Sequence, residues 1–205
     1  MHEHHFVQNE SHLLTRRRFL TVSFASPAAF TLAVLGGLVT LPPTPACADD
    51  DDVTPRNVEG PFYKPQSPRR ASLLEQGMKG TKLLLTGRVR STDRTPIARA
   101  MLDFWQADAH GVYDNDGYRM RGHQFTDGSG RYSLETIVPG PYFPRTPHIH
   151  VKVQAPNQPI LTTQLFFLGE GRNGFDPLFK PALLMAVRET QHGKEATFDF
   201  VVARR

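Results

Sequence analysis

The chain has 205 residues, 39% of them hydrophobic, and a formal net charge of +4 at pH 7. This length suits one ordinary domain or two small ones. The small charge excess is spread along the chain, so the composition does not predict a nucleic-acid-binding protein. The single cysteine, Cys47, excludes a disulfide within the chain.

The first segment has the layout of an export signal. Thr15-Arg16-Arg17-Arg18-Phe19-Leu20 precedes an uncharged apolar run at 21–41, and the small residues Ala46-Cys47-Ala48 follow. We therefore expect residues 1–48 to be a cleaved signal peptide of the twin-arginine type and the mature protein to be periplasmic or extracellular. A retained membrane anchor is the alternative, because 22–41 is nearly long enough to span a bilayer. Lipidation at Cys47 is a weaker one.

Residues 49–80 predict an extended N-terminal arm. Within it, the segment 57–69 (NVEGPFYKPQSPR) contains three prolines and one glycine. Proline removes a backbone donor and restricts the residue before it, so neither a helix nor a central strand is expected here. Phe62 and Tyr63 are the apolar side chains expected to attach this arm to the rest of the protein.

Residues 81–205 predict a single all-β domain. Short strand-like runs are separated by turn signals rich in glycine and proline, and long helical periodicity is absent. The runs lie at 83–89, 98–105, 132–137, 148–153, 161–167, 183–187 and 196–202. This pattern favours a β-sandwich of two sheets with about seven to eight strands and few short helices.

His148 and His150 fall in one of these predicted strands. Side chains two residues apart in a strand point to the same face, so both imidazoles can reach one point and form half of a metal site. Packing histidines are the alternative. The nearby hard donors are the phenols of Tyr113, Tyr118, Tyr132 and Tyr142. A phenol has an ordinary pKa of about 10, so it binds best to a highly charged hard cation, and ferric iron is the expected metal.

Several motifs occur in order from about residue 54 to 167. They are 59–63 (EGPFY), 103–108 (DFWQAD), 111–113 (GVY), 126–132 (TDGSGRY), 136–142 (TIVPGPY), Arg145, 148–150 (HIH) and 163–167 (TQLFF). Together they resemble the intradiol ring-cleavage dioxygenase family, which includes the protocatechuate 3,4-dioxygenases and catechol 1,2-dioxygenases. Many ordered matches make the resemblance far more specific than the two histidines alone.

The resemblance implies a mononuclear non-haem Fe(III) site with four ligands, which are Tyr113, Tyr142, His148 and His150. It implies that dioxygen cleaves a catechol-type substrate to a cis,cis-muconate-type diacid. In the family, the tyrosine at the position of Tyr142 leaves the iron when substrate binds, while Arg145 and Gln164 match residues that stabilise the reacting complex. Tyr118 and Tyr132 are then expected to be packing residues.

The sequence leaves the substrate open. The short connection from Tyr142 to His148, with Phe143-Pro144 inside it, departs from the protocatechuate enzymes. Protocatechuate, catechol, a hydroxyquinol and a catechol unit released from a larger aromatic polymer all fit. The expected partners are a small catechol and O2, with no nucleic acid and no membrane after signal cleavage.

A different class of protein is the alternative. A secreted transthyretin-like β-sandwich could use the same fold as a binding module with a structural or vestigial metal site. The sequence does not decide whether the protein forms a homo-oligomer. It also does not define the roles of Trp105, Asp108 and His123.

Overall fold

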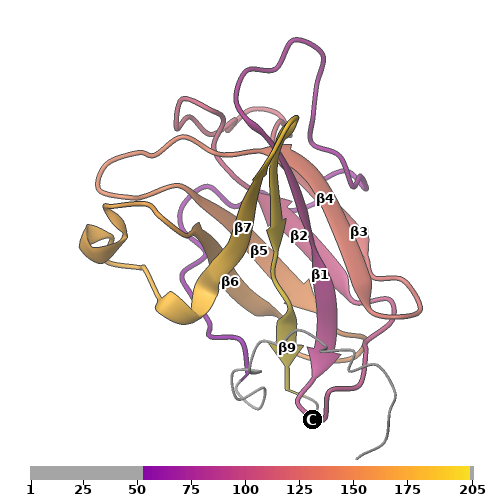
Figure 1. Ribbon diagram of the computed structural model, residues 1–205. Coiled ribbons are helices and arrows are strands. Elements are labelled where there is room, and N and C mark those ends of the chain that lie inside the picture. Colours follow the sequence, from indigo (N-terminus) through magenta and orange to yellow (C-terminus); the bar gives the residue numbers. More distant parts are fainter. Residues whose placement is uncertain (1–52, 204–205) are drawn as a thin grey trace, which may run out of the picture. The chain divides into compact units, whose positions relative to one another are not determined.

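The computed structural model describes residues 53–203, so the expected signal at 1–48 lies outside the described residues. The described part folds into nine strands and two short 3-10 turns (Figure 1). Within residues 53–203 no helix has the length and apolar character needed to cross a membrane. The expectation of an all-β protein with few short helices is confirmed.

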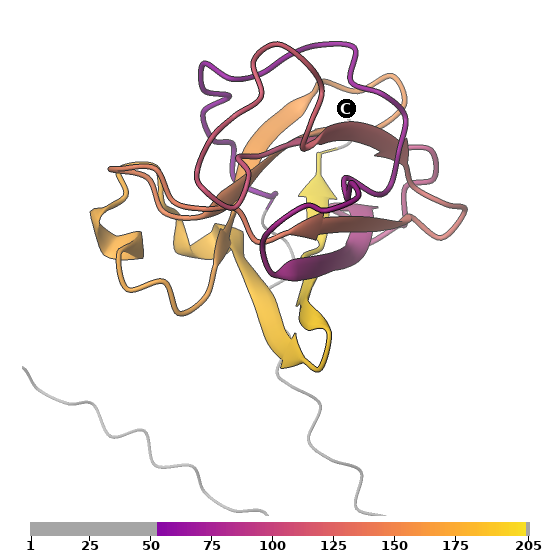
Figure 2. The same cartoon turned by 90° about the horizontal axis from the view of Figure 1, so that it is seen from above.

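The strands form two layers connected by one strand. Their bounds are β1 Lys82–Ser91, β2 Met101–Trp105, β3 Arg121–Phe125, β4 Arg131–Ile137, β5 His148–Gln154, β6 Leu161–Phe167, β7 Leu184–Thr190, β8 Gly193–Thr197 and β9 Phe200–Val202, with η1 at Asn173–Phe175 and η2 at Pro181–Leu183. The hydrogen-bonded order is β3-β2-β5-β6-β7-β8-β1-β4, and β9 pairs with β1. The start of β7 pairs with β6 and the rest pairs with β8, so β7 joins the two sheets of the sandwich. Figure 2 shows the β7–β8 hairpin, in yellow, extending away from the other strands.

Alternation of side chains places the core between the layers. In β4, Tyr132 and Leu134 point inward while their neighbours are exposed. In β5, Ile149 and Val151 join this core. The other face of β5, which carries the two histidines, is also buried, because the arm and two long loops cover it. Burial on both faces is unusual for a strand of an antiparallel sheet and marks β5 as the centre of the fold.

Residues 53–81 follow an extended path, drawn in violet in Figure 1, with no helix or named strand. Backbone hydrogen bonds attach the arm at several points. Asn57 N donates to Thr162 O on β6, Arg70 N donates to His123 O on β3, and Leu73 N donates to Glu135 O on β4. The arm thereby crosses both layers and carries Phe62 toward the histidine face of β5.

The sequence runs did not predict β3. Its residues, RGHQF, alternate poorly and begin with an arginine. Arg121 is nevertheless buried, because its guanidinium donates from Nη1 to Phe62 O at 2.6 Å and from Nη2 to Asp114 O at 2.8 Å. A polar strand is therefore stabilised by long-range contacts that a local pattern does not contain.

The run expected at 196–202 is also two strands rather than one. It breaks at Phe198 and Asp199, where an Asp199 carboxylate oxygen accepts from Arg88 N at 2.7 Å. At this point Arg88 N of β1 bonds to the Asp199 side chain instead of a backbone carbonyl of the neighbouring strand. The pairing is therefore interrupted, and β8 and β9 are separate strands that both pair with β1.

The close packing of β1 gives a stability prediction. A Cβ at Gly87 would lie 1.8 Å from Phe198 O and 3.0 Å from the ring of Tyr132. Gly87→Ala should therefore lower the free energy of unfolding by about 1–3 kcal/mol, as overpacking does elsewhere. Urea denaturation measures this change. Gly128→Ala is the matched control, since a Cβ at that position would meet nothing within 4 Å, and equal losses in both variants would refute the packing account.

Candidate metal centre

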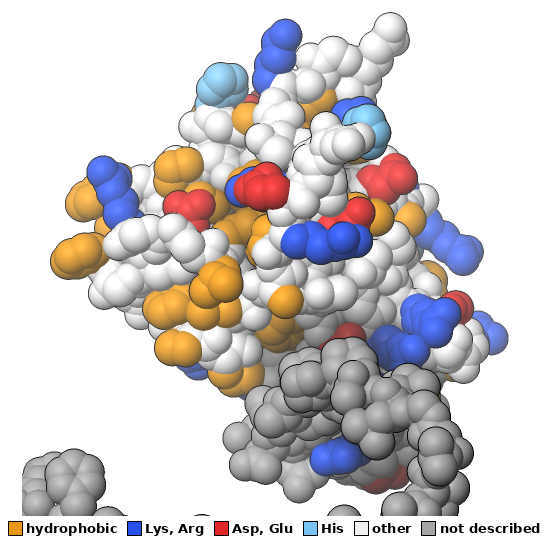
Figure 3. Space-filling model, in the orientation of Figure 1, with side chains coloured by type: hydrophobic (Ala, Val, Ile, Leu, Met, Phe, Trp, Pro, Cys, Tyr) orange, Lys and Arg blue, Asp and Glu red, His pale blue; other side chains and the backbone are white. Residues whose placement is uncertain are grey.

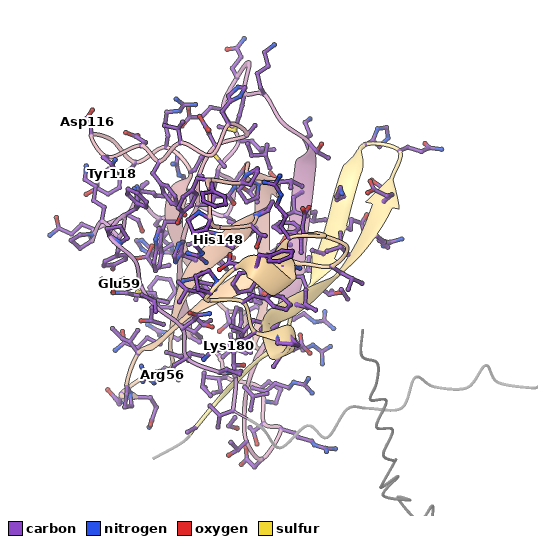
Figure 4. All side chains as sticks on the ribbon, turned by 90° about the vertical axis from the view of Figure 1, so that its left-hand side faces the viewer. Arg56, Glu59, Asp116, Tyr118, His148 and Lys180 are labelled. Atoms are coloured by element: carbon purple, nitrogen blue, oxygen red, sulfur yellow. The ribbon has the colours of Figure 1, made fainter. Side chains whose placement is uncertain are left out.

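Three parts of the chain bring four donor side chains together. β5 provides His148 and His150, the loop between β4 and β5 provides Tyr142, and the loop between β2 and β3 provides Tyr113. Tyr113 Oη lies 3.4 Å from His148 Nε2, which lies 3.1 Å from His150 Nε2. The Tyr142 ring centroid lies 5.7 Å from that of Tyr113 and 5.5 Å from that of His148. Figure 4 shows His148 in the middle of this face of the molecule.

Two glycines let the tyrosine loops approach each other. Gly111 has φ +81°, and a Cβ there would lie 2.4 Å from Pro141 O. A Cβ at Gly140 would lie 2.5 Å from Ala109 O. Each glycine stands two residues before a tyrosine, so the motifs G-x-Y and P-G-x-Y encode both the donor and the contact that places it.

Asp108 shapes the first of these loops. Its carboxylate accepts from His110 N at 2.8 Å and from Val112 N at 3.0 Å, and its carbonyl accepts from Gly140 N at 2.8 Å. The side chain therefore closes the turn before Tyr113 and does not reach the four donors.

The remaining tyrosines lie elsewhere. Tyr118 donates its hydroxyl to Pro65 O at 2.9 Å, and the buried Tyr132 donates to Phe198 O at 2.8 Å. Both side chains hold segments of the fold together. The spacing of the four tyrosines in the sequence does not show which of them belong to the donor set. Their long-range contacts in the structure do.

The two imidazoles are held in their neutral form. Burial lowers the pKa of His148 to about 4 from an ordinary 6.5. The pKa of His150 is lowered well below its ordinary value, mainly by burial and then by the neighbouring His148 and Arg145. His148 Nδ1 lies 2.6 Å from Thr146 O, so Nδ1 carries the proton and Nε2 presents a lone pair. His150 Nδ1 is buried without a hydrogen-bond partner among the described residues.

This donor set fits a highly charged cation. Neutral imidazoles with converging nitrogens are the form that binds a metal. Burial, and then the neighbouring Tyr142, raise the pKa of Tyr113 far above its ordinary value, so only a strong Lewis acid displaces that proton. Two nitrogen and two phenol oxygen donors, with no thiolate among them, suit ferric iron better than a soft metal.

Aromatic rings enclose the donors. Phe62, from the arm, stacks on Tyr113 with ring centroids 4.3 Å apart and planes 15° apart. Trp105, from β2, stacks on His150 at 4.8 Å and 10°. These contacts fix two of the four rings and keep water from their outer faces, which assigns Trp105 a packing role beside the site.

Arg145 and Gln164 lie together beside the donors. Arg145 Nη2 donates to Gln164 Oε1, and Gln164 Nε2 donates to Val58 O on the arm at 2.6 Å. Arg145 Nε donates to both carboxylate oxygens of Asp176, at 2.9 and 3.0 Å. Burial opposes ionisation of Asp176, yet hydrogen bonds from Leu178, Thr146 and Arg145 outweigh it and lower the pKa of its carboxyl.

Sequence reasoning missed Asp176 because no local motif marks it. It lies in the loop between β6 and β7, 31 residues after the arginine it contacts. His123, whose role the sequence left open, is away from the donors. Its Nδ1 lies 2.8 Å from Ser67 O, so it attaches the arm to β3.

Comparison with known families and curated proteins gives a consistent set of relatives. A family model described as Dioxygenase matches residues 58–203. The chain is 30% identical to Catechol 1,2-dioxygenase 2 of Acinetobacter lwoffii over 180 residues, 74% of this chain and 66% of that protein. It is 30% identical to Hydroxyquinol 1,2-dioxygenase of Nocardioides simplex over 152 residues, 62% of this chain and 52% of that protein. The chain thus spans between half and two thirds of the length of these relatives.

Solved structures show the same fold. The dioxygenase domain of a dioxygenase carbohydrate-binding protein fusion from Streptomyces sp. SirexAA-E is 53% identical, with a TM-score of 0.73 over 74% of this chain and 99% of that chain. The 3-chlorocatechol 1,2-dioxygenase from Rhodococcus opacus 1CP is 28% identical, with a TM-score of 0.69 over 74% of this chain and 73% of that chain.

The buried imidazoles give a pH prediction for the metal-free protein. The unfolded chain protonates His148 below pH 6.5, whereas the folded chain resists protonation until about pH 4. The free energy of unfolding should therefore fall as the pH drops through this window, by about 3 kcal/mol from this residue. Urea titrations at several pH values measure the slope of the free energy of unfolding against pH.

Two variants separate this effect from general acid denaturation. His148→Gln should reduce the slope between pH 6.5 and 4. His192→Gln, at an exposed position between β7 and β8, should leave it unchanged. An unaltered slope in His148→Gln would contradict burial as the cause.

Proposed function

This chain belongs to the intradiol ring-cleavage dioxygenase family, and we propose that it uses ferric iron and O2 to cleave a catechol-type ring between its two hydroxylated carbons, giving a cis,cis-muconate-type diacid. The observation that carries the proposal is the convergence of two phenols and two neutral imidazoles at one buried point. Tyr113, Tyr142, His148 and His150 would hold the ion. Bound there, ferric iron draws electron density from a catecholate and makes its ring reactive toward dioxygen.

The protein's own residues have two tasks in this reaction. A catechol must lose two protons to bind as a dianion, so the site needs proton acceptors. Tyr142 is only half-buried, unlike Tyr113, and this exposure supports Tyr142 as the residue whose oxygen would accept one of these protons. The family behaviour of this tyrosine, which leaves the metal on substrate binding, agrees with that exposure.

Arg145 has the second task. Its guanidinium keeps its positive charge at every working pH and stabilises negative charge that develops on the substrate oxygens. Gln164 holds one edge of the guanidinium and is itself attached to the arm through Val58 O. Arg145 therefore acts from a fixed position, which is where electrostatic stabilisation is most effective.

We also propose that the substrate carries an apolar substituent outside the reacting ring. Three of the most exposed apolar side chains in residues 53–203 each adjoin, along the chain, a metal donor or the aspartate that contacts Arg145. These pairs are Val112–Tyr113, Phe143–Tyr142 and Phe175–Asp176. Figure 3 shows apolar side chains gathered at the left-hand edge, over the 142–147 loop and η1. We propose that these three side chains form an apolar rim at the entrance to the site, which would suit an aryl-bearing catechol.

An exported enzyme would meet such compounds outside the cell. We propose export through the signal at 1–48, supported by its arginines and its small-residue cleavage site. The twin-arginine route moves folded proteins, which would allow the iron to be inserted before export.

The metal proposal predicts a coloured protein. The purified chain should contain about one iron per chain and show a red-brown charge-transfer band from ferric tyrosinate. The double variant Tyr113→Phe with Tyr142→Phe should lose the band and all catechol-dependent oxygen uptake, because both phenolates are gone. Visible spectra, iron analysis and an oxygen electrode measure these properties.

Tyr118→Phe is the matched control, since this tyrosine donates to Pro65 O away from the donors. It should keep both colour and activity. A colourless, iron-free wild-type protein would instead favour the secreted transthyretin-like binding module. A band that survives the double variant would show that the ligand assignment is wrong.

The rim predicts a selective effect on substrate binding. Phe143 is 90% exposed, so Phe143→Ala should leave the fold intact. Losing an aromatic contact worth about 1 kcal/mol should raise KM several-fold for a catechol with an aryl substituent and leave KM for catechol itself unchanged. Phe125→Ala, at the far end of β3, is the control, and equal effects on both substrates would refute the rim proposal.

A further inference from the structure

Asp176 is a buried carboxylate with no role in the function proposed so far. It follows η1 in the loop between β6 and β7, and its side chain has no solvent exposure. One carboxylate oxygen accepts from Leu178 N at 2.9 Å, and the other accepts from Thr146 N at 2.9 Å and Thr146 Oγ1 at 3.1 Å. Arg145 Nε lies within hydrogen-bond distance of both oxygens. Every side of the carboxylate is therefore fixed.

The first group that Asp176 controls is the Arg145 guanidinium. Nε is bound to Asp176 and Nη2 to Gln164, while none of the hydrogen bonds among residues 53–203 uses Nη1. Nη1 is the nitrogen left for a substrate oxygen. A free arginine side chain loses rotamer entropy when it is fixed, and here most of that cost is met during folding.

The second group is the His148 imidazole. Asp176 binds both the backbone N and the hydroxyl of Thr146, and the carbonyl of Thr146 accepts from His148 Nδ1 at 2.6 Å. This carbonyl fixes both the tautomer and the ring orientation of His148. A metal-binding histidine generally needs such an outer partner, and here the partner is itself held by a carboxylate.

Stability alone explains this arrangement poorly. A buried ion pair is often no better for stability than well-packed apolar side chains, because two charges must leave water. The Asp176 pair is placed instead where it reaches both the substrate-side cation and one metal-binding imidazole. Because one carboxylate connects to both groups, we attribute its presence to the positioning of these groups rather than to the stability of the fold.

We propose that Asp176 is a positioning residue, which holds the Arg145 guanidinium directly and the His148 imidazole through Thr146. The inference rests on the proposed function, because its two connections end at the substrate and at the metal. Asp176 itself touches neither. Its removal should therefore produce two distinguishable losses, one in turnover and one in metal retention.

The test compares Asp176→Asn with Arg145→Gln in the iron-loaded protein. Asp176→Asn should lower kcat by about 10- to 100-fold, in the range found for outer partners of metal ligands. It should also speed iron release to a chelator several-fold, followed as decay of the visible band without any substrate. Arg145→Gln should lower kcat but leave iron release unchanged, since the Thr146–His148 connection stays intact. Asp127→Asn, an exposed loop aspartate that caps its own turn, controls for loss of a hydrogen-bonded carboxylate.

A double-variant cycle then tests the path of the turnover effect. If Asp176 acts through Arg145, Asp176→Asn should lower kcat much less in the Arg145→Gln background than it does in the wild-type protein. Full additivity of the two losses, or wild-type kcat and iron release in Asp176→Asn, would overturn the inference. If Asp176→Asn does not fold, Asp176→Glu replaces it in the test. This variant should show the same losses in kcat and iron retention, but smaller ones, because it keeps the negative charge. A wild-type protein that lacks iron or turnover would refute the proposed function instead.

Discussion

Burial of two neutral imidazoles on one face of β5 is the constraint on which the rest of the structure depends. Desolvation keeps both rings uncharged, and His148 Nε2 and His150 Nε2 face each other at 3.1 Å. At this distance one nitrogen donates a hydrogen bond to the other, or both nitrogens bind a shared cation. The arm, the two tyrosine loops and Trp105 enclose this pair, so the fold brings the four donors together at one buried point.

A single polar network connects the elements that surround the pair. It runs from Val58 O on the arm to Gln164 on β6, then through Arg145, Asp176 and Thr146 to His148 on β5. Every step except the last, from Thr146 to His148, joins residues that are well separated in the sequence. A fully satisfied network of this kind specifies one arrangement of its members, whereas a partly satisfied one is costly. The site is therefore held by the same contacts that close the arm over the sheet.

Local patterns in the sequence predicted the sheet and the histidine pair, since strand alternation needs only neighbouring residues. They did not choose Tyr113 over Tyr118, because a phenol in a loop is placed by distant contacts such as those of Gly111 and Gly140. The family motifs supplied that choice. β3 was missed because Arg121 is buried only through carbonyls of other segments. Asp176 was missed for the same reason, since nothing in its own loop marks it.

Charge balance explains why an aspartate belongs beside Arg145. The charge of Arg145 lowers the pKa of His148, and the charge of Asp176 acts in the opposite direction. Without Asp176 the guanidinium would add an uncompensated positive charge beside the two imidazoles. With Asp176 the pair is neutral overall, yet its positive end lies toward Gln164. The pair therefore places a directional cation beside the four donors while adding no net charge to the site.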